Sequence, residues 1–133
     1  MPEATSNQND DMSKGTDVIR QLFGTEYLRR TQDAPRNGRS ELRELGFEII
    51  FGRIWDRPGV DQKTRILCSI SALVVMGLDK HLGQYIKGAL NIGVEPQSIK
   101  EIILMLSFYG GFPNSMKAMA VLDDIEEQNK PKI

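Results

Sequence analysis

Four side chains near the middle of the chain have the types that proton transfer and carboxylate binding require. Glu48 lies inside the apolar run "FEIIF" (47–51), and burial there would raise its pKa so that the carboxyl could act as an acid or a base. His81 is the only histidine, and a histidine side chain suits a proton shuttle at physiological pH. Arg57 and Arg65 can each hold a carboxylate through two parallel hydrogen bonds.

Each of these residues also has a purely structural interpretation. The Glu48 carboxylate can form an ion pair with an arginine close to it in the sequence or the fold, such as Arg53, Arg57 or Arg65. The two candidate arginines can instead pin the turn "RPGVD" and a subunit interface. A histidine near a helix start is often exposed and without a role, and His81 follows a predicted helix start at Asp79.

Composition excludes several other classes of function. The chain has 133 residues and a formal net charge of −1, so we expect neither nucleic acid nor a membrane surface as a partner. No secretory leader and no apolar run long enough to span a bilayer is present, and we therefore expect a cytoplasmic protein. Cys68 and His81 are the only residues of their types, which excludes an internal disulfide, a CxxC redox pair and a Cys/His zinc cage.

The elements that must position these side chains are helices throughout, because no segment alternates in the manner of a strand. Residues 1–14 contain little to bury and are predicted to be a disordered tail, followed by one helical domain over 15–128 and a C-terminal tail over 129–133. We expect a compact bundle of about six helices. They are predicted to start at Thr16 or Asp17, near Ser40, after an N-cap at Asp61, at Asp79, at Pro96 and at about Pro113.

One of these helices and one joint between helices are unusually apolar. From Ile66 to Met76 the third helix is apolar nearly all round, which predicts burial on most of its faces. The joint "SFYGGFP" (107–113) between the last two helices places Phe108, Tyr109 and Phe112 around two glycines. One glycine can adopt positive φ and the following proline suits a helix start. The aromatic rings then need an apolar surface, in the same chain or in a neighbouring one.

Three motifs, in this order, resemble those of the carboxymuconolactone decarboxylase family. They are "FGRIWDRPGVDQKTRIL" (51–67), "YIKGALNIGVEPQSIKEIIL" (85–104) and "YGGFP" (109–113), and "FGTEYLRR" (23–30) resembles the N-terminal helix of that family. The matching residues are Gly52, Trp55, Arg57, Pro58, Gly59, Asp61, Thr64, Arg65, Gly88, Ala89, Leu90, Asn91, Gly93, Tyr109, Gly111, Phe112 and Pro113. The resemblance covers roughly residues 16–125.

The resemblance implies an all-helical fold, related to alkyl hydroperoxidase D, that assembles as a homotrimer or homohexamer with its pocket near subunit contacts. Such contacts would cover the third helix and the aromatic joint. The resemblance also implies substrate-binding roles for Trp55, Tyr109 and Phe112, together with Arg57 and Arg65.

The same resemblance separates two branches of the family. The peroxidase branch uses a CxxC pair and a relay glutamate, whereas here Cys68 is alone and Ile66 follows Arg65. We therefore expect no peroxidase activity. In the decarboxylase motif Tyr85 stands in place of a histidine, Lys87 stands in place of an arginine, and His81 lies one helical turn before Tyr85.

These replacements indicate an enzyme of this family with a changed pocket. Tyr85, with Glu48 and His81, is the candidate catalytic acid or enolate donor, although a packing role for the tyrosine is equally compatible with its position. We expect a lyase, isomerase or cyclase that needs no cofactor and acts on a small carbonyl or lactone compound, in aromatic degradation or secondary metabolism. The alternative is a helical oligomer without catalysis that serves binding or scaffolding.

Overall fold

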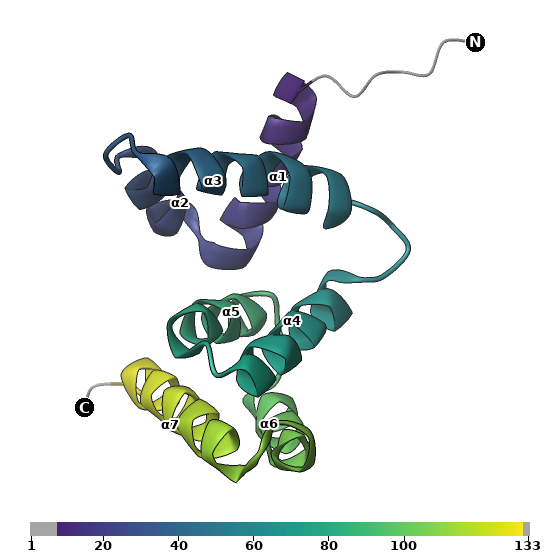
Figure 1. Ribbon diagram of the computed structural model, residues 1–133, viewed down its shortest axis with the longest axis vertical. Coiled ribbons are helices and arrows are strands. Elements are labelled where there is room, and N and C mark those ends of the chain that lie inside the picture. Colours follow the sequence, from purple (N-terminus) through teal and green to yellow (C-terminus); the bar gives the residue numbers. More distant parts are fainter. Residues whose placement is uncertain (1–7, 132–133) are drawn as a thin grey trace. The chain divides into compact units, whose positions relative to one another are not determined.

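The computed structural model describes residues 8–131, and these residues are helical with no strand (Figure 1). This confirms the predicted all-α class. The helices are α1 (Gln8–Phe23), α2 (Thr25–Gln32), α3 (Gly38–Gly46), the π-helix η1 (Phe47–Ile54), α4 (Gln62–Met76), α5 (Asp79–Asn91), α6 (Pro96–Gly110) and α7 (Phe112–Asn129). Packing divides the chain after Asp61 into two compact units, and the predicted domain over 15–128 spans both.

The first unit is held together by the crossing of α1 and η1. Its core contains aliphatic residues of α1 and α2 and aromatic residues of η1, namely Val18, Ile19, Leu22, Phe23, Leu28, Phe47, Phe51 and Trp55. Two glycines allow the backbones to approach closely at this crossing. A Cβ added to Gly15 would lie 1.8 Å from the Phe47 carbonyl oxygen, and one added to Gly52 would lie 2.0 Å from the Asp11 carbonyl oxygen.

This crossing also explains why α1 begins earlier than predicted. The expected start at Thr16 or Asp17 is wrong, because the helix already includes residues 8–14 of the predicted tail. Asp11 is only 4% exposed, and its carboxylate lies 3.7 Å from Nε of Arg53 on η1. Tertiary contacts therefore order a segment whose composition is typical of a tail. The remainder of that predicted tail, residues 1–7, lies outside the described residues.

The helix ends in this unit depend on local backbone chemistry. Gly24 has φ +92°, a conformation that separates α1 from α2 where the sequence predicts one continuous helix. The N-cap of α3 is Asn37, three residues before Ser40, near which the sequence predicts the helix start. Ser40 is the third residue of that helix and forms the reciprocal half of a capping box, with each backbone N–H donating to the other residue's side chain.

The apolar run "FEIIF" continues α3 as a π-helix. The Trp55 backbone N–H donates to the Ile50 carbonyl five residues earlier, at 2.8 Å. A π-helix has more residues in each turn than an α-helix and often occurs at functional sites. It places Phe47, Phe51 and Trp55 together in the core, where the Phe51 ring centroid lies 5.4 Å from that of Trp55.

The second unit is built on a hairpin of α4 and α5. The two-residue connection starts with Gly77 at φ +71°, and the Leu78 N–H donates to the Leu73 carbonyl at 3.0 Å, as in a Schellman motif. Gly93 ends α5 in the same way, as the sequence predicts. The two helices run antiparallel, because Nζ of Lys63 at the start of α4 lies 3.5 Å from a Cβ added at Gly93.

Helices α6 and α7 pack on this hairpin and on each other. Pro96 and Pro113 lie in the first turns of α6 and α7, as expected. Gly111 has φ +94° and makes the joint between them. The Ser115 hydroxyl donates to the Ile103 carbonyl at 3.1 Å, and the Asn114 amide donates to the Val75 carbonyl at 3.0 Å, so the joint is fastened to both α6 and the end of α4.

The prediction that α4 is buried on most faces is wrong within this chain. Only the stripe Ile66, Ile70 and Val74 is buried, because α5, α6 and α7 all cover that side. Cys68, which was expected on a buried face, is exposed. The other apolar side chains of α4 are therefore not fully covered by the described helices of this unit. No helix in the described part of the chain is long and apolar enough to cross a membrane.

Candidate active site

The outer side of α5 presents two of the three predicted catalytic residues. His81 and Tyr85 are separated by four residues, so they lie one above the other on the same helix face. His81 is exposed and Tyr85 is half-buried. Tyr85 directly precedes Ile86, which is fully buried with Leu82 and Ala89 in the core. The tyrosine is thereby held on a rigid helix at the edge of the core.

Arg65 lies on the neighbouring helix of the same unit. It is half-buried in the first turns of α4, at the end of the hairpin where Lys63 approaches Gly93. From this antiparallel pairing, Arg65 and Tyr85 are separated along the hairpin axis by roughly 9 Å, at about 1.5 Å for each residue. Both residues therefore belong to the same hairpin, Arg65 on α4 and Tyr85 on α5.

The other predicted residues between positions 48 and 57 belong to the first unit. Glu48 is half-buried in the first turn of η1. Trp55, at the end of η1, is buried against Phe51 in the aromatic core of that unit, and Arg57 is exposed in the turn that follows. Arg53, one of the suggested ion-pair partners of Glu48, lies instead within 3.7 Å of Asp11.

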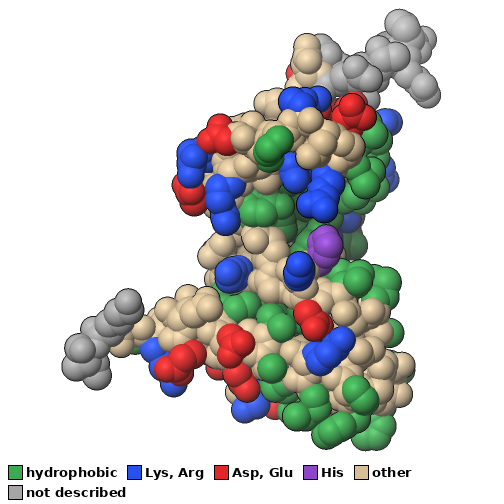
Figure 2. All heavy atoms as spheres, turned by 60° about the vertical axis from the view of Figure 1, so that its left-hand side comes forward, with side chains coloured by type: hydrophobic (Ala, Val, Ile, Leu, Met, Phe, Trp, Pro, Cys, Tyr) green, Lys and Arg blue, Asp and Glu red, His purple; other side chains and the backbone are tan. Residues whose placement is uncertain are grey.

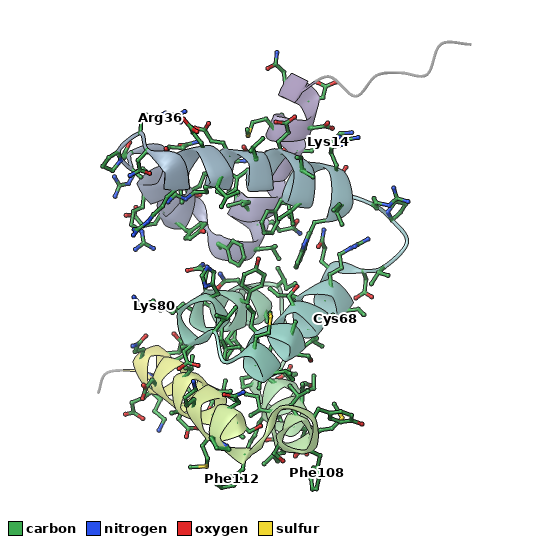
Figure 3. All side chains as sticks on the ribbon, in the orientation of Figure 1. Lys14, Arg36, Cys68, Lys80, Phe108 and Phe112 are labelled. Atoms are coloured by element: carbon green, nitrogen blue, oxygen red, sulfur yellow. The ribbon has the colours of Figure 1, made fainter. Side chains whose placement is uncertain are left out.

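The predicted aromatic contacts of the α6–α7 joint are highly exposed. Phe108, Tyr109 and Phe112 are 91%, 75% and 68% exposed, and the side chains of Phe108 and Phe112 point away from the ribbon (Figure 3). Figure 2 shows hydrophobic side chains gathered over the end of this unit where α6 and α7 meet. Tyr109 and Phe112 thus come together at the joint and are uncovered in the single chain.

Sequence reasoning missed the π-helix that carries Glu48. A π-turn rotates the following side chains relative to an α-helix, so it decides which way Glu48 faces. The available indication was an apolar run without a 3.6-residue period, followed by Gly52. Within residues 8–131, His, Cys, Asp and Glu side chains form no group of three or more that could hold a metal ion.

Comparison with known proteins identifies relatives of the whole helical region. The chain is 26% identical over 119 residues to 4-carboxymuconolactone decarboxylase from Acinetobacter baylyi, covering 90% of this chain and 89% of that protein. It is 32% identical over 121 residues to nitrosuccinic acid decarboxylase npaB from Metarhizium robertsii, covering 85% and 82%. An uncharacterized 15.0 kDa protein from Paracoccus denitrificans is 34% identical over 80 residues, covering 59% and 60%.

The family assignment agrees with these relatives. The model of the carboxymuconolactone decarboxylase family matches residues 41–124, which include η1, the α4–α5 hairpin and the α6–α7 joint. The decarboxylase names of two relatives support an enzyme of the decarboxylase type. The chain belongs to the carboxymuconolactone decarboxylase family.

Proposed function

We propose that the protein is a lyase that needs no cofactor and removes carbon dioxide from a small acid whose carboxylate lies close to a carbonyl, lactone or similar electron-withdrawing group. Two relatives carry names that specify decarboxylation of small acids. The observation that carries the proposal is the arrangement on the α4–α5 hairpin, where the rigidly held Tyr85 and His81 share a face and a half-buried Arg65 lies on the adjacent helix.

The reaction divides into one bond cleavage and one proton transfer. The carbon–carbon bond to the carboxylate breaks, and its electron pair moves into the electron-withdrawing group, which becomes an enolate or its equivalent. Carbon dioxide leaves, and the carbon then receives a proton. A hydrogen-bond donor at the developing negative charge stabilises the transition state, and a positioned acid accelerates the protonation.

The residues of this chain have separate roles in that scheme. Arg65 holds a carboxylate group of the substrate by charge-assisted hydrogen bonds. Tyr85 donates a hydrogen bond to the enolate oxygen or a proton to the carbon, and His81, one turn away, returns a proton to Tyr85. In the first unit, Glu48 is a separate candidate acid and Arg57 a separate candidate for binding a carboxylate. Tyr109 and Phe112 supply apolar contacts to the substrate.

We also propose that the protein works as a homo-oligomer, a trimer or a hexamer. The aromatic joint is surrounded by further exposed apolar side chains from three helices, namely Val75, Met76, Leu104, Met105 and Met116. Monomeric proteins rarely expose a contiguous apolar surface of this kind, and a symmetric contact between copies would bury it. Tyr109 and Phe112 would then contact substrate where subunits meet.

The test is a pair of matched tyrosine variants assayed with 4-carboxymuconolactone and with nitrosuccinic acid. Tyr85→Phe removes one hydroxyl and keeps the ring, and loss of a positioned acid is expected to reduce kcat by on the order of 10²-fold. Tyr27→Phe makes the same chemical change at a tyrosine that has no role in the proposed reaction, and it should leave turnover unchanged. Release of carbon dioxide and thermal unfolding are measured for both variants.

The outcomes separate catalysis from packing. A large loss of kcat in Tyr85→Phe with normal stability supports the proposal, whereas normal turnover with reduced stability would assign Tyr85 a packing role. Restoring the family residue with Tyr85→His tests substrate choice, because a gain of 4-carboxymuconolactone decarboxylation would show that this position selects the reaction. If Tyr85→Phe and Glu48→Gln are both silent, the non-catalytic scaffold becomes the better interpretation.

A further inference from the structure

The first unit contains a cavity of about 270 Å³ that involves none of the residues assigned to the reaction. It lies among α1, α2, the loop between α2 and α3, α3 itself and the start of η1. The residues that line it are Met12, Thr16, Leu28, Thr31, Gln32, Ala34, Arg36, Ser40, Arg43, Glu44 and Phe47. Its volume is just below the usual range for ligand pockets, about 300–1,000 Å³, so it suits a ligand with a single ring.

One side of this cavity is apolar. Leu28 and Phe47 are both buried in the core of the unit, and the Phe47 ring is fixed by an edge-on contact with Phe51 at a centroid separation of 6.3 Å. Met12 and Ala34 extend the apolar lining. A flat hydrophobic group can pack here against a ring that is already held in place, which limits the entropy lost on binding.

The other side carries a positive charge that the protein itself does not neutralise. Arg36 and Glu44 form an ion pair with each other, and Figure 3 shows Arg36 on the loop that joins α2 and α3. Arg43 is half-buried and lines the same cavity. Among the residues that the structure describes, no carboxylate lies within ion-pair distance of Arg43.

Two of the three hydroxyl groups of the lining, those of Thr31 and Ser40, form local contacts. The Thr31 hydroxyl donates to the Leu28 carbonyl at 2.7 Å, and the Ser40 hydroxyl donates to the Asn37 carbonyl at 2.8 Å. They shape the walls and stabilise the helix ends. Arg43 is the cation of the lining that forms no ion pair among the described residues, and its planar guanidinium matches a carboxylate.

We propose that this cavity binds a small aromatic carboxylate, with the ring against Leu28 and Phe47 and the carboxylate on Arg43. The pairing of Glu44 with Arg36 removes the main source of repulsion for such an anion. This site is separate from the residues of the proposed decarboxylase reaction, and its occupant need not be the substrate. Binding also stabilises the first unit by mass action.

Benzoate is the probe. Each of two matched control compounds lacks one of the two groups that the cavity is proposed to recognise, the ring or the negative charge. Benzamide keeps the ring and removes the charge, and acetate keeps the charge and removes the ring. Isothermal titration of the full chain should give a dissociation constant on the order of 1 mM or tighter for benzoate. Both controls should bind at least about tenfold more weakly.

Two variants and one control variant locate the binding. Arg43→Met removes the charge with little change in length, and Ala34→Phe fills the cavity from the loop. Each should weaken benzoate binding by about tenfold or more. Arg39→Met changes an exposed arginine of the same helix that does not line the cavity, and it should bind benzoate as the unchanged protein does.

The proposal is overturned by any of three results. The first is that the folded protein binds no benzoate when the benzoate concentration is several times the expected dissociation constant. The second is equal affinity for benzamide, which would show that Arg43 does not recognise the charge. The third is unchanged affinity in Arg43→Met or Ala34→Phe with normal circular dichroism, which would place binding elsewhere. Decarboxylase turnover is measured in parallel, so failure of this site and failure of the proposed reaction are distinguishable.

Discussion

Replacing Gly52 by alanine tests whether the crossing of α1 and η1 is as close as the structure shows. The new Cβ would lie 2.0 Å from the Asp11 carbonyl oxygen and 2.8 Å from its carbon. Contacts of this kind below 3.0 Å are essentially absent from proteins. Both nearby atoms belong to the backbone, so no side chain can turn away, and the two helices must separate by at least about 1 Å.

The magnitude follows from the opposing effects of the added methyl group. Inserting a methylene-sized group into a packed interior costs typically about 1–3 kcal/mol, and a gap of about 1 Å forfeits up to half of the dispersion energy of the atoms facing it. Alanine is favoured over glycine inside a helix by up to about 1 kcal/mol. Because the whole α1–η1 contact must shift, we expect Gly52→Ala to lower the free energy of unfolding by about 1–3 kcal/mol.

The assay is urea unfolding followed by the fluorescence of Trp55, the only tryptophan, which lies at the end of η1. Gly46→Ala is the matched control, because its new Cβ would meet only the end of the Ile50 side chain at 3.8 Å. That control should be neutral or more stable by up to about 1 kcal/mol. A Gly52→Ala protein as stable as the Gly46→Ala protein would refute the close crossing and the packing of residues 8–14 that depends on it.

Three other predictions concern pH, redox chemistry and assembly. Burial raises the pKa of Tyr27 above its usual value of 10.0, and the positive charges of Arg43 and Arg30 oppose this effect only in part. The Tyr27 hydroxyl therefore loses its proton at a lower pH in the unfolded chain than in the folded chain, so the free energy of unfolding should fall as pH rises above about 10. Between pH 8 and 11 the urea midpoint of Tyr27→Phe should fall less steeply than that of the unsubstituted protein. Cys68→Ser should leave turnover unchanged although the thiol is exposed, because a lone cysteine has no resolving partner, and a large loss of activity in a folded variant would contradict this. Light scattering at micromolar concentration should show that the unsubstituted protein is a trimer or hexamer. The double variant Phe108→Asp, Phe112→Asp should dissociate it, and an unsubstituted protein that is monomeric would exclude the proposed assembly.

The order and type of most helices could be predicted from local sequence patterns. Gly93 adopts positive φ and ends α5, and Pro96 and Pro113 lie in the first turns of the next two helices. These features depend on the conformational limits of glycine and proline, which act within a few residues. The family was also recognisable, because its motifs combine such residues with charged and aromatic positions in a specific order.

Other features were decided only when distant segments packed together. The segment at residues 8–14 has the composition of a tail, yet Asp11 is buried where α1 crosses η1. The apolar faces of α4 and of the α6–α7 joint are equally hydrophobic in the sequence, but only the stripe that meets α5, α6 and α7 is buried. Hydrophobicity is a property of each residue and can be read locally. Burial depends on which surface arrives to cover it, and therefore only the tertiary structure distinguishes the core of this protein from the apolar surface it leaves exposed.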